Sequence, residues 1–138
     1  MRKAIGSLIL ISLSSTLFVA AQNVQNLPAL KQKQPYDNVA SQVMKSDSDF
    51  TSTVIWIKQE VKPHYHASHF EQVYVIEGTG QMLVDNNRFD VGPGDLINIP
   101  IGTIHALRVT SKLPMKVLSI QTPQFDGSDR VMIEKAGW

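Results

Sequence analysis

The spacing of hydrophobic and polar residues divides this chain into three parts. Residues 1–21 are mainly apolar with interrupting serines, residues 22–50 are mainly polar and interrupted by Pro28 and Pro35, and short alternating stretches follow from residue 51 onward. Alternation with a period of two is typical of β-strands, whereas an amphipathic helix repeats about every 3.6 residues. Because no window after the first part shows the helical period, we predict an all-β domain.

Turn signals separate the alternating stretches into short strands. Gly78-Thr79-Gly80, Asp85-Asn86-Asn87 and Gly92-Pro93-Gly94 are turn-forming triplets, and they recur roughly every eight to ten residues. This spacing favours a β-sandwich or a β-barrel, and closing a barrel removes exposed sheet edges. We expect seven or eight strands in all, including those over residues 51–61, 71–77, 81–84, 88–91, 95–99, 104–110 and 115–122.

The first 21 residues have the three parts of a secretory signal peptide. Arg2 and Lys3 precede the apolar run, and Val19-Ala20-Ala21 provides small residues for cleavage before Gln22. An uncleaved membrane anchor is the alternative, but serines interrupt the run, and it is short for a span of about 20 residues. We therefore expect a signal peptide at 1–21, an N-terminal arm with short strands at 22–50 and a β-barrel at 51–138, with the mature protein periplasmic or secreted.

Composition narrows the partners. The 138 residues are 43% hydrophobic, which suits one globular domain, and the net charge is only +1. Basic residues form no stripe, so nucleic-acid binding is not expected, nor is membrane association after signal cleavage. The chain has no cysteine, so no disulfide stabilises it and no lipid can be attached at a cysteine next to the cleavage site.

The four histidines are unevenly distributed. His64, His66 and His69 lie within six positions, and His105 is the fourth. On a strand, His64 and His66 point to the same face, and Glu71 begins the next alternating stretch. Two imidazoles and a carboxylate that converge are suited to one divalent metal ion such as Fe, Mn, Ni or Zn. His105 could complete a set of four protein ligands. The alternative is that His64 and His66 are ordinary polar residues on the solvent-facing side of a strand.

Two spaced motifs carry a family resemblance. Residues 64–78 read H-x-H-x4-E-x6-G, and residues 94–105 read G-x5-P-x-G-x2-H. Together they resemble the two motifs of the cupin superfamily, and the resemblance covers residues 51–122. It implies a jelly-roll β-barrel (a double-stranded β-helix) with a metal inside its mouth. The family's four ligand positions fall on His64, His66, Glu71 and His105.

Other residues lie outside these ligand positions. Lys58 and Val109 stand where the family pattern has glycine and asparagine. Because of these two differences, the sequence does not assign the chain to any one group of enzymes within the family. His69 lies outside the ligand pattern, and we expect a loop or rim residue, with an accessory proton shuttle as the alternative. The candidates for substrate binding are Lys58, Gln81 and Trp56.

Three functions remain open from the sequence. The resemblance implies a metal-dependent enzyme, such as a dioxygenase, decarboxylase or isomerase, acting on a small oxygen-rich molecule. The same pocket could instead bind a sugar or organic acid without turnover, or the metal could serve mainly to stabilise an assembly. Small barrels of this family often pair, so we also expect a homodimer.

Overall fold

The described part of the protein is built from β-strands. The computed structural model describes residues 24–134, so the expected signal peptide lies outside the described residues. Within 24–134 there are ten strands and no α-helix, which confirms the all-β prediction. In the same part of the chain, no helix has the length and apolar character needed to cross a membrane. The strands are β1 (Val39–Ser46), β2 (Thr51–Ile57), β3 (Glu60–His66), β4 (Phe70–Glu77), β5 (Gly80–Val84), β6 (Asn87–Val91), β7 (Leu96–Ile99), β8 (His105–Val109), β9 (Met115–Thr122) and β10 (Arg130–Met132).

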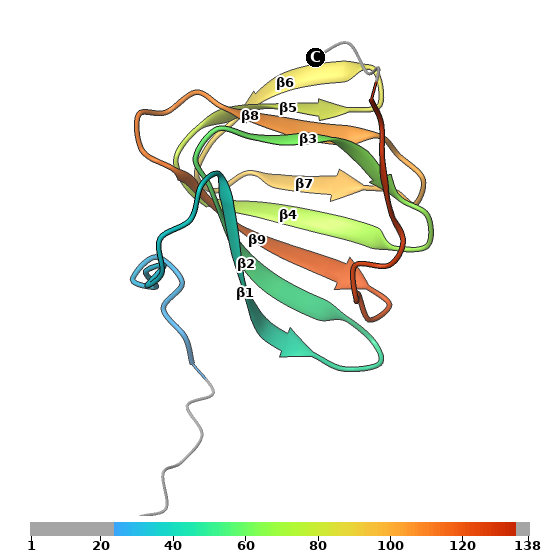
Figure 1. Cartoon of the computed structure of the whole chain (residues 1–138), viewed down its shortest axis with the longest axis horizontal. Coiled ribbons are helices and arrows are strands. Elements are labelled where there is room, and N and C mark those ends of the chain that lie inside the picture. Colours follow the sequence, from blue (N-terminus) through green and yellow to red (C-terminus); the bar gives the residue numbers. More distant parts are fainter. Residues whose placement is uncertain (1–23, 135–138) are drawn as a thin grey trace, which may run out of the picture.

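The strands form two antiparallel sheets that face each other (Figure 1). The first sheet has the order β1-β2-β9-β4-β7, and the second has the order β10-β3-β8-β5-β6. Hydrogen-bonded neighbours such as β2 and β9, or β3 and β8, are far apart in the sequence, so the chain passes repeatedly from one sheet to the other. Two facing sheets with such crossovers are the arrangement of a jelly roll.

One expected strand is in fact two. The stretch 51–61 breaks at Lys58 and Gln59, where the chain leaves β2 in the first sheet and enters β3 in the second. No glycine or proline marks this turn, because Asn38 from the N-terminal segment satisfies its backbone. The Asn38 side-chain oxygen accepts hydrogen bonds from the backbone N–H groups of Gln59 (2.9 Å) and Glu60 (3.2 Å). A long-range contact therefore replaces the local turn signal.

The core fills the space between the sheets. Val75, Met115 and Val117 come from the first sheet and are at most 3% exposed, and they share one cluster with Met82 and Leu107 from the second sheet. Residues directly opposite each other in antiparallel strands share a face, so the register of these residues defines the inner face of each sheet. The functional site lies on the same inner face.

Two glycines allow the crossing from β4 to β5. Gly78 has φ of +79°, a left-handed conformation that glycine adopts without strain. Gly80 has no such φ, but its neighbours leave no room for a side chain. A Cβ there would lie 2.6 Å from Met115 Sδ and 2.8 Å from the Arg108 carbonyl oxygen. A side chain at Gly80 would therefore force β5 away from the core.

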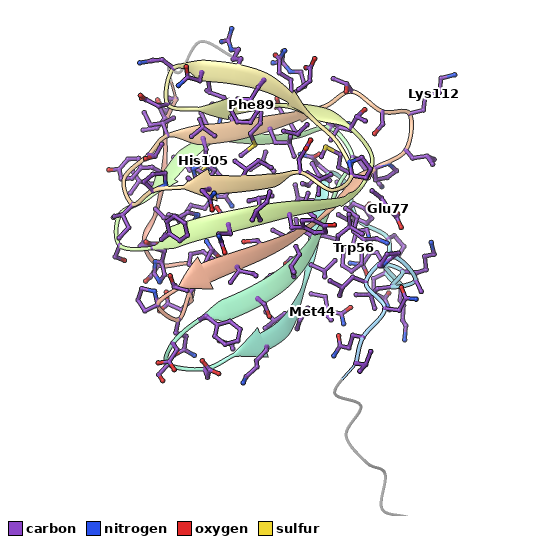
Figure 2. The ribbon with its side chains drawn as sticks, turned by 180° about the vertical axis from the view of Figure 1, so that it is seen from behind. Met44, Trp56, Glu77, Phe89, His105 and Lys112 are labelled. Carbon is purple, nitrogen blue, oxygen red and sulfur yellow. The ribbon has the colours of Figure 1, made fainter. Side chains whose placement is uncertain are left out.

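The N-terminal segment (residues 24–38) covers part of the outer face of the first sheet. Figure 2 shows Trp56 and Glu77 beside this segment. Trp56 is 6% exposed although it lies opposite Lys116 in the register, on the face that points away from the core. Lys116 is also buried, and its ammonium group donates hydrogen bonds to the Leu27 and Pro28 carbonyls. The segment therefore acts as an additional layer over β2 and β9.

Candidate metal centre

Three histidines converge on the inner face of the second sheet. β3 and β8 pair with His64 opposite His105, and a register shift between Val61 and His64 sets the phase of the H-x-H stretch. His66 follows two residues later, so it has the same orientation as His64. One ring nitrogen from each of the three histidines lies within 4.8 Å of the others, and each residue is 4% exposed. His105 thus lies between the sheets rather than on the surface (Figure 2).

Hydrogen bonds at Nδ1 fix the orientation of the rings. His64 Nδ1 lies 2.8 Å from the Lys62 carbonyl oxygen, and His105 Nδ1 lies 3.0 Å from the Thr103 carbonyl oxygen. A carbonyl can only accept, so each of these Nδ1 atoms carries the proton and Nε2 keeps its lone pair. His66 Nδ1 lies 3.1 Å from a carboxylate oxygen of Asp129, which favours the same tautomer. Three imidazoles are therefore held with Nε2 available as a ligand, as metal-binding histidines usually are.

His105 provides the test of whether a metal fits. Its Nε2 is buried and makes no hydrogen bond to any residue of the described chain. Buried polar atoms almost always have a partner, and a lone pair held in this way would be satisfied by a metal ion. The three-imidazole set is also one that Zn, Ni and Fe commonly accept. The residues present therefore fit a metal ion.

Glu71 reaches the same place from the opposite sheet. On β4 it is 7% exposed, and its Oε2 lies 3.2 Å from His105 Nε2 and 3.6 Å from His66 Nε2. Its Oε1 accepts a hydrogen bond from the Ser119 hydroxyl at 2.5 Å. Burial raises the pKa of Glu71, but His105, Ser119 and His66 outweigh it, and the net pKa is lowered. A carboxylate is thus held ionised beside two of the imidazoles, and its role as the fourth ligand stays a prediction.

Two further features bear on metal binding. Burial, with a smaller contribution from the charge of Arg130, lowers the pKa of His64 to about 3, so the ring is neutral at physiological pH. Gln121, on β9, places its amide nitrogen 3.1 Å from His66 Nε2. That amide donates to the lone pair that a metal would need, so binding at His66 would replace this hydrogen bond.

The segment after β9 completes the site, and the sequence analysis missed it. The Asp129 carboxylate contacts His66 Nδ1 through Oδ1, and its Oδ2 contacts His69 Nδ1 at 2.5 Å. The Ser68 backbone N–H (2.9 Å) and hydroxyl (3.0 Å) also donate to Oδ2. Burial raises the pKa of Asp129, but its hydrogen bonds to His69, Ser68 and His66 lower it well below its usual range. Asp129 therefore stays ionised and orients His66.

His69 lies in the loop between β3 and β4 and is 6% exposed. Its Nδ1 faces Asp129, and its Nε2 lies 2.9 Å from the Gln124 carbonyl oxygen. Burial lowers the pKa of His69, but the hydrogen bonds to Asp129 and Gln124 raise it above the usual value. Both nitrogens face acceptors, so the imidazolium form fits best, and the ring supports Asp129 from behind His66. The proton-shuttle role stays a prediction.

The three candidate substrate residues do not lie at the histidine cluster. Lys58 is exposed at the turn after β2, where its ammonium group lies 4.2 Å from the centre of the Tyr36 ring. Trp56 points to the outer face, under the N-terminal segment. Gln81 is three residues from Val84, which pairs with His105, so Gln81 points away from the interior. The alternation of strand faces explains the placements of Trp56 and Gln81, whereas that of Lys58 depends on the unexpected turn.

Comparisons with known proteins agree with this geometry. Residues 53–121 match the family described as the cupin domain. An uncharacterized protein of Aquifex aeolicus is 36% identical over 81 residues, which is 59% of this chain and 66% of that protein. Quercetin 2,3-dioxygenase of Bacillus subtilis is 38% identical over 48 residues, or 35% of this chain and only 14% of the enzyme.

A solved structure supports the fold. A Klebsiella pneumoniae protein, described as uncharacterized and conserved with a double-stranded β-helix domain, superposes with a TM-score of 0.65 and 19% identity. The match covers 75% of this chain and 90% of that protein. The expected jelly-roll architecture is therefore confirmed, and so is the resemblance on which it was based: this chain belongs to the cupin family.

Proposed function

We propose that this protein is an exported cupin that holds one divalent metal ion, of iron, manganese, nickel or zinc, on His64, His66, His105 and Glu71. The observation that carries the proposal is the set of three buried imidazoles whose Nδ1 atoms are turned to acceptors. This arrangement leaves Nε2 of His105 buried and without a hydrogen bond. Keeping that lone pair unsatisfied costs stability unless a ligand binds there.

We further propose that the metal serves an enzyme acting on a small oxygen-rich molecule. A bound metal would polarise a carbonyl or carboxylate oxygen or, if redox-active, activate dioxygen. The local similarity to quercetin 2,3-dioxygenase supports a reaction of the dioxygenase class, although it covers a small part of that enzyme. Decarboxylation and isomerisation are alternatives within the same proposal, and binding without turnover is the non-catalytic alternative.

Elemental analysis of the purified protein tests the metal assignment. The protein should be isolated without chelators or a metal-affinity column, and its metal content measured by inductively coupled plasma mass spectrometry. We expect near-stoichiometric metal in the wild type and little in His105→Gln, with unchanged circular dichroism. Gln81→Ala, on the outer face of the same sheet, is the matched control and should keep its metal. Full occupancy in His105→Gln would contradict the assignment.

Export and pairing are separate proposals. The three-part pattern of residues 1–21 supports export, and N-terminal sequencing of protein recovered from the periplasm or medium should begin at Gln22.

Pairing is supported by Tyr74 and Leu96, which are opposite each other on the outer face of the first sheet and are 41% and 53% exposed. We expect a dimer by light scattering, which Tyr74→Lys should convert to a monomer.

A further inference from the structure

Arg130 occupies a distinctive place beside the histidines. On β10 it lies directly opposite His66, and Met132 lies opposite His64. Residues directly opposite each other in antiparallel strands share a face, so Arg130 is on the same side of the sheet as the metal-binding candidates. One guanidinium nitrogen, Nη2, is 3.4 Å from His64 Nδ1. The guanidinium of Arg130 is therefore held next to His64, one of the proposed metal ligands.

Within the described residues, the Arg130 guanidinium has N–H groups that make no hydrogen bond to a carboxylate. His64 Nδ1 donates its proton to the Lys62 carbonyl at 2.8 Å, so it cannot also accept from Arg130. Among residues 24–134, no carboxylate makes an ion pair with Arg130; the carboxylates of the site lie beside His66, His69 and His105 instead. Glu71 acts on Arg130 only through its charge at longer range. In the described part of the chain, a guanidinium with five N–H groups is thus without a carboxylate partner.

The position of Arg130 is open to solvent, unlike the histidines. The residue is exposed, whereas His64, His66 and His105 are each 4% exposed. Its guanidinium is nevertheless partly buried, since burial lowers the pKa of Arg130, and Nη2 reaches the His64 ring. Arg130 therefore connects the buried histidines to the exposed edge of the second sheet.

The charges of the site also favour an anion. The Asp129 charge is balanced by His69, with which it forms an ion pair. The Glu71 charge then remains against the positive charges of Arg130 and of a divalent metal. An added carboxylate would bring the site closer to neutrality, and a guanidinium binds a carboxylate through two parallel hydrogen bonds.

We propose that Arg130 anchors the carboxylate of a small organic acid that also reaches the metal. This inference rests on the proposed metal function and specifies its substrate class. The guanidinium contacts the ring of a proposed metal ligand, so a molecule of only a few atoms spans both groups. Formate and a short α-hydroxy acid such as glycolate are suitable probes.

The test compares each acid with its neutral amide. Formate and formamide, and glycolate and glycolamide, are titrated calorimetrically into the metal-loaded protein at constant ionic strength. We expect at least one acid to bind the wild type about tenfold or more tightly than its amide. Arg130→Gln should remove that preference, and Arg130→Lys should keep part of it because a point charge remains without the two-pronged geometry. Gln81→Ala should behave as the wild type.

Metal content separates the two levels of the proposal. If the wild type binds no metal, the proposed function fails. If the wild type binds metal but shows no preference for either acid, or if Arg130→Gln keeps the preference, the anion inference is overturned and the metal assignment stands. Loss of metal from Arg130→Gln would assign the residue a structural role and also overturn the inference.

Discussion

The two faces of the first sheet each bury a charged residue, and they treat it differently. On the outer face, Lys116 is 2% exposed, and its ammonium group has three acceptors. They are the carbonyls of Leu27 (3.3 Å) and Pro28 (2.9 Å) and the carboxylate of Glu77 (2.9 Å). An ammonium has three N–H donors, so every donor has a partner. On the inner face, Glu71 lies among imidazoles, one of which has a buried nitrogen without any hydrogen bond.

The number of unpaired polar atoms distinguishes the structural cluster around Lys116 from the proposed ligand site around the histidines. Leaving a buried polar group unpaired costs about 1–3 kcal/mol, so a purely structural cluster is expected to be complete, as it is at Lys116. The histidine cluster is incomplete at His105 Nε2, which has no hydrogen-bond partner within the described residues, whereas the Nδ1 atoms of all three rings are paired. This single unpartnered nitrogen, among rings that are otherwise held in place, supports the proposed metal site. The predictions below test this distinction.

The largest expected effect is on acid stability of the metal-free protein. His64 has a folded-state pKa of about 3, whereas an ordinary histidine titrates near 6.5. Below pH 6.5 the unfolded chain takes up a proton that the folded ring does not. The contribution of His64 is therefore complete above pH 6.5 and is lost at about 1.4 kcal/mol per pH unit as pH falls towards 3.

A matched variant isolates this contribution. The free energy of unfolding is measured in urea for the metal-free wild type and His64→Gln at pH 7, 6, 5 and 4. The stability advantage of the wild type should shrink as pH falls, because Gln does not titrate. An advantage that stays constant across this range would show that His64 is not held neutral by the fold.

Removing a ligand should have the next largest effect. His66→Ala should lower metal affinity by more than about a hundredfold, because the loss of even a residue behind a ligand costs about 10–100-fold. Glu71→Gln should also bind less metal if the carboxylate is the fourth ligand. Competition with a chelating dye measures both affinities. Wild-type affinity in Glu71→Gln would remove Glu71 from the ligand set and leave the three histidines.

Removing the outer-face cation should affect stability but not metal binding. Lys116→Met leaves the Leu27 and Pro28 carbonyls without their donor, and we expect a loss of about 1–3 kcal/mol in the free energy of unfolding. Urea denaturation and dye competition on the same variant measure the two properties. A comparable loss of metal affinity would mean that the two faces are coupled and that the contrast between them is not as sharp as their contacts indicate.

The local sequence pattern predicted the all-β fold, and the two motifs that resemble the cupin family predicted the jelly roll and the residues of the central cluster. Period-two alternation predicts the strands, and the faces it assigns to His64, His66 and Glu71 are those that converge in the structure. The same rule would have turned Gln81 and Trp56 away from the site had the register been known. Register depends on which distant strands pair, and a single strand does not contain that information.

Long-range contacts explain the rest of what was missed. The break at Lys58 is stabilised by Asn38, which is about 20 residues away in the sequence and gives no local turn signal. Asp129 is 63 residues from His66 and lies in a stretch, Asp126-Gly127-Ser128-Asp129, that resembles an ordinary surface turn. Only the fold shows that this turn places a carboxylate behind a histidine and carries Arg130 to the same site.

Asp129 gives the smallest and most specific test of the contrast. Asp129→Asn keeps the shape of the side chain but removes the charge that holds His66 and His69. We expect a tenfold or somewhat larger loss of metal affinity, measured by dye competition, because outer residues orient the ligand without binding the metal. Ser68→Ala, which removes only one hydroxyl donor to the same carboxylate, is the control and should bind metal almost normally. Equal affinities for wild type and Asp129→Asn would mean that the backbone of β3 alone orients His66. The C-terminal segment would then not be needed to orient the three histidine rings of the inner face for metal binding.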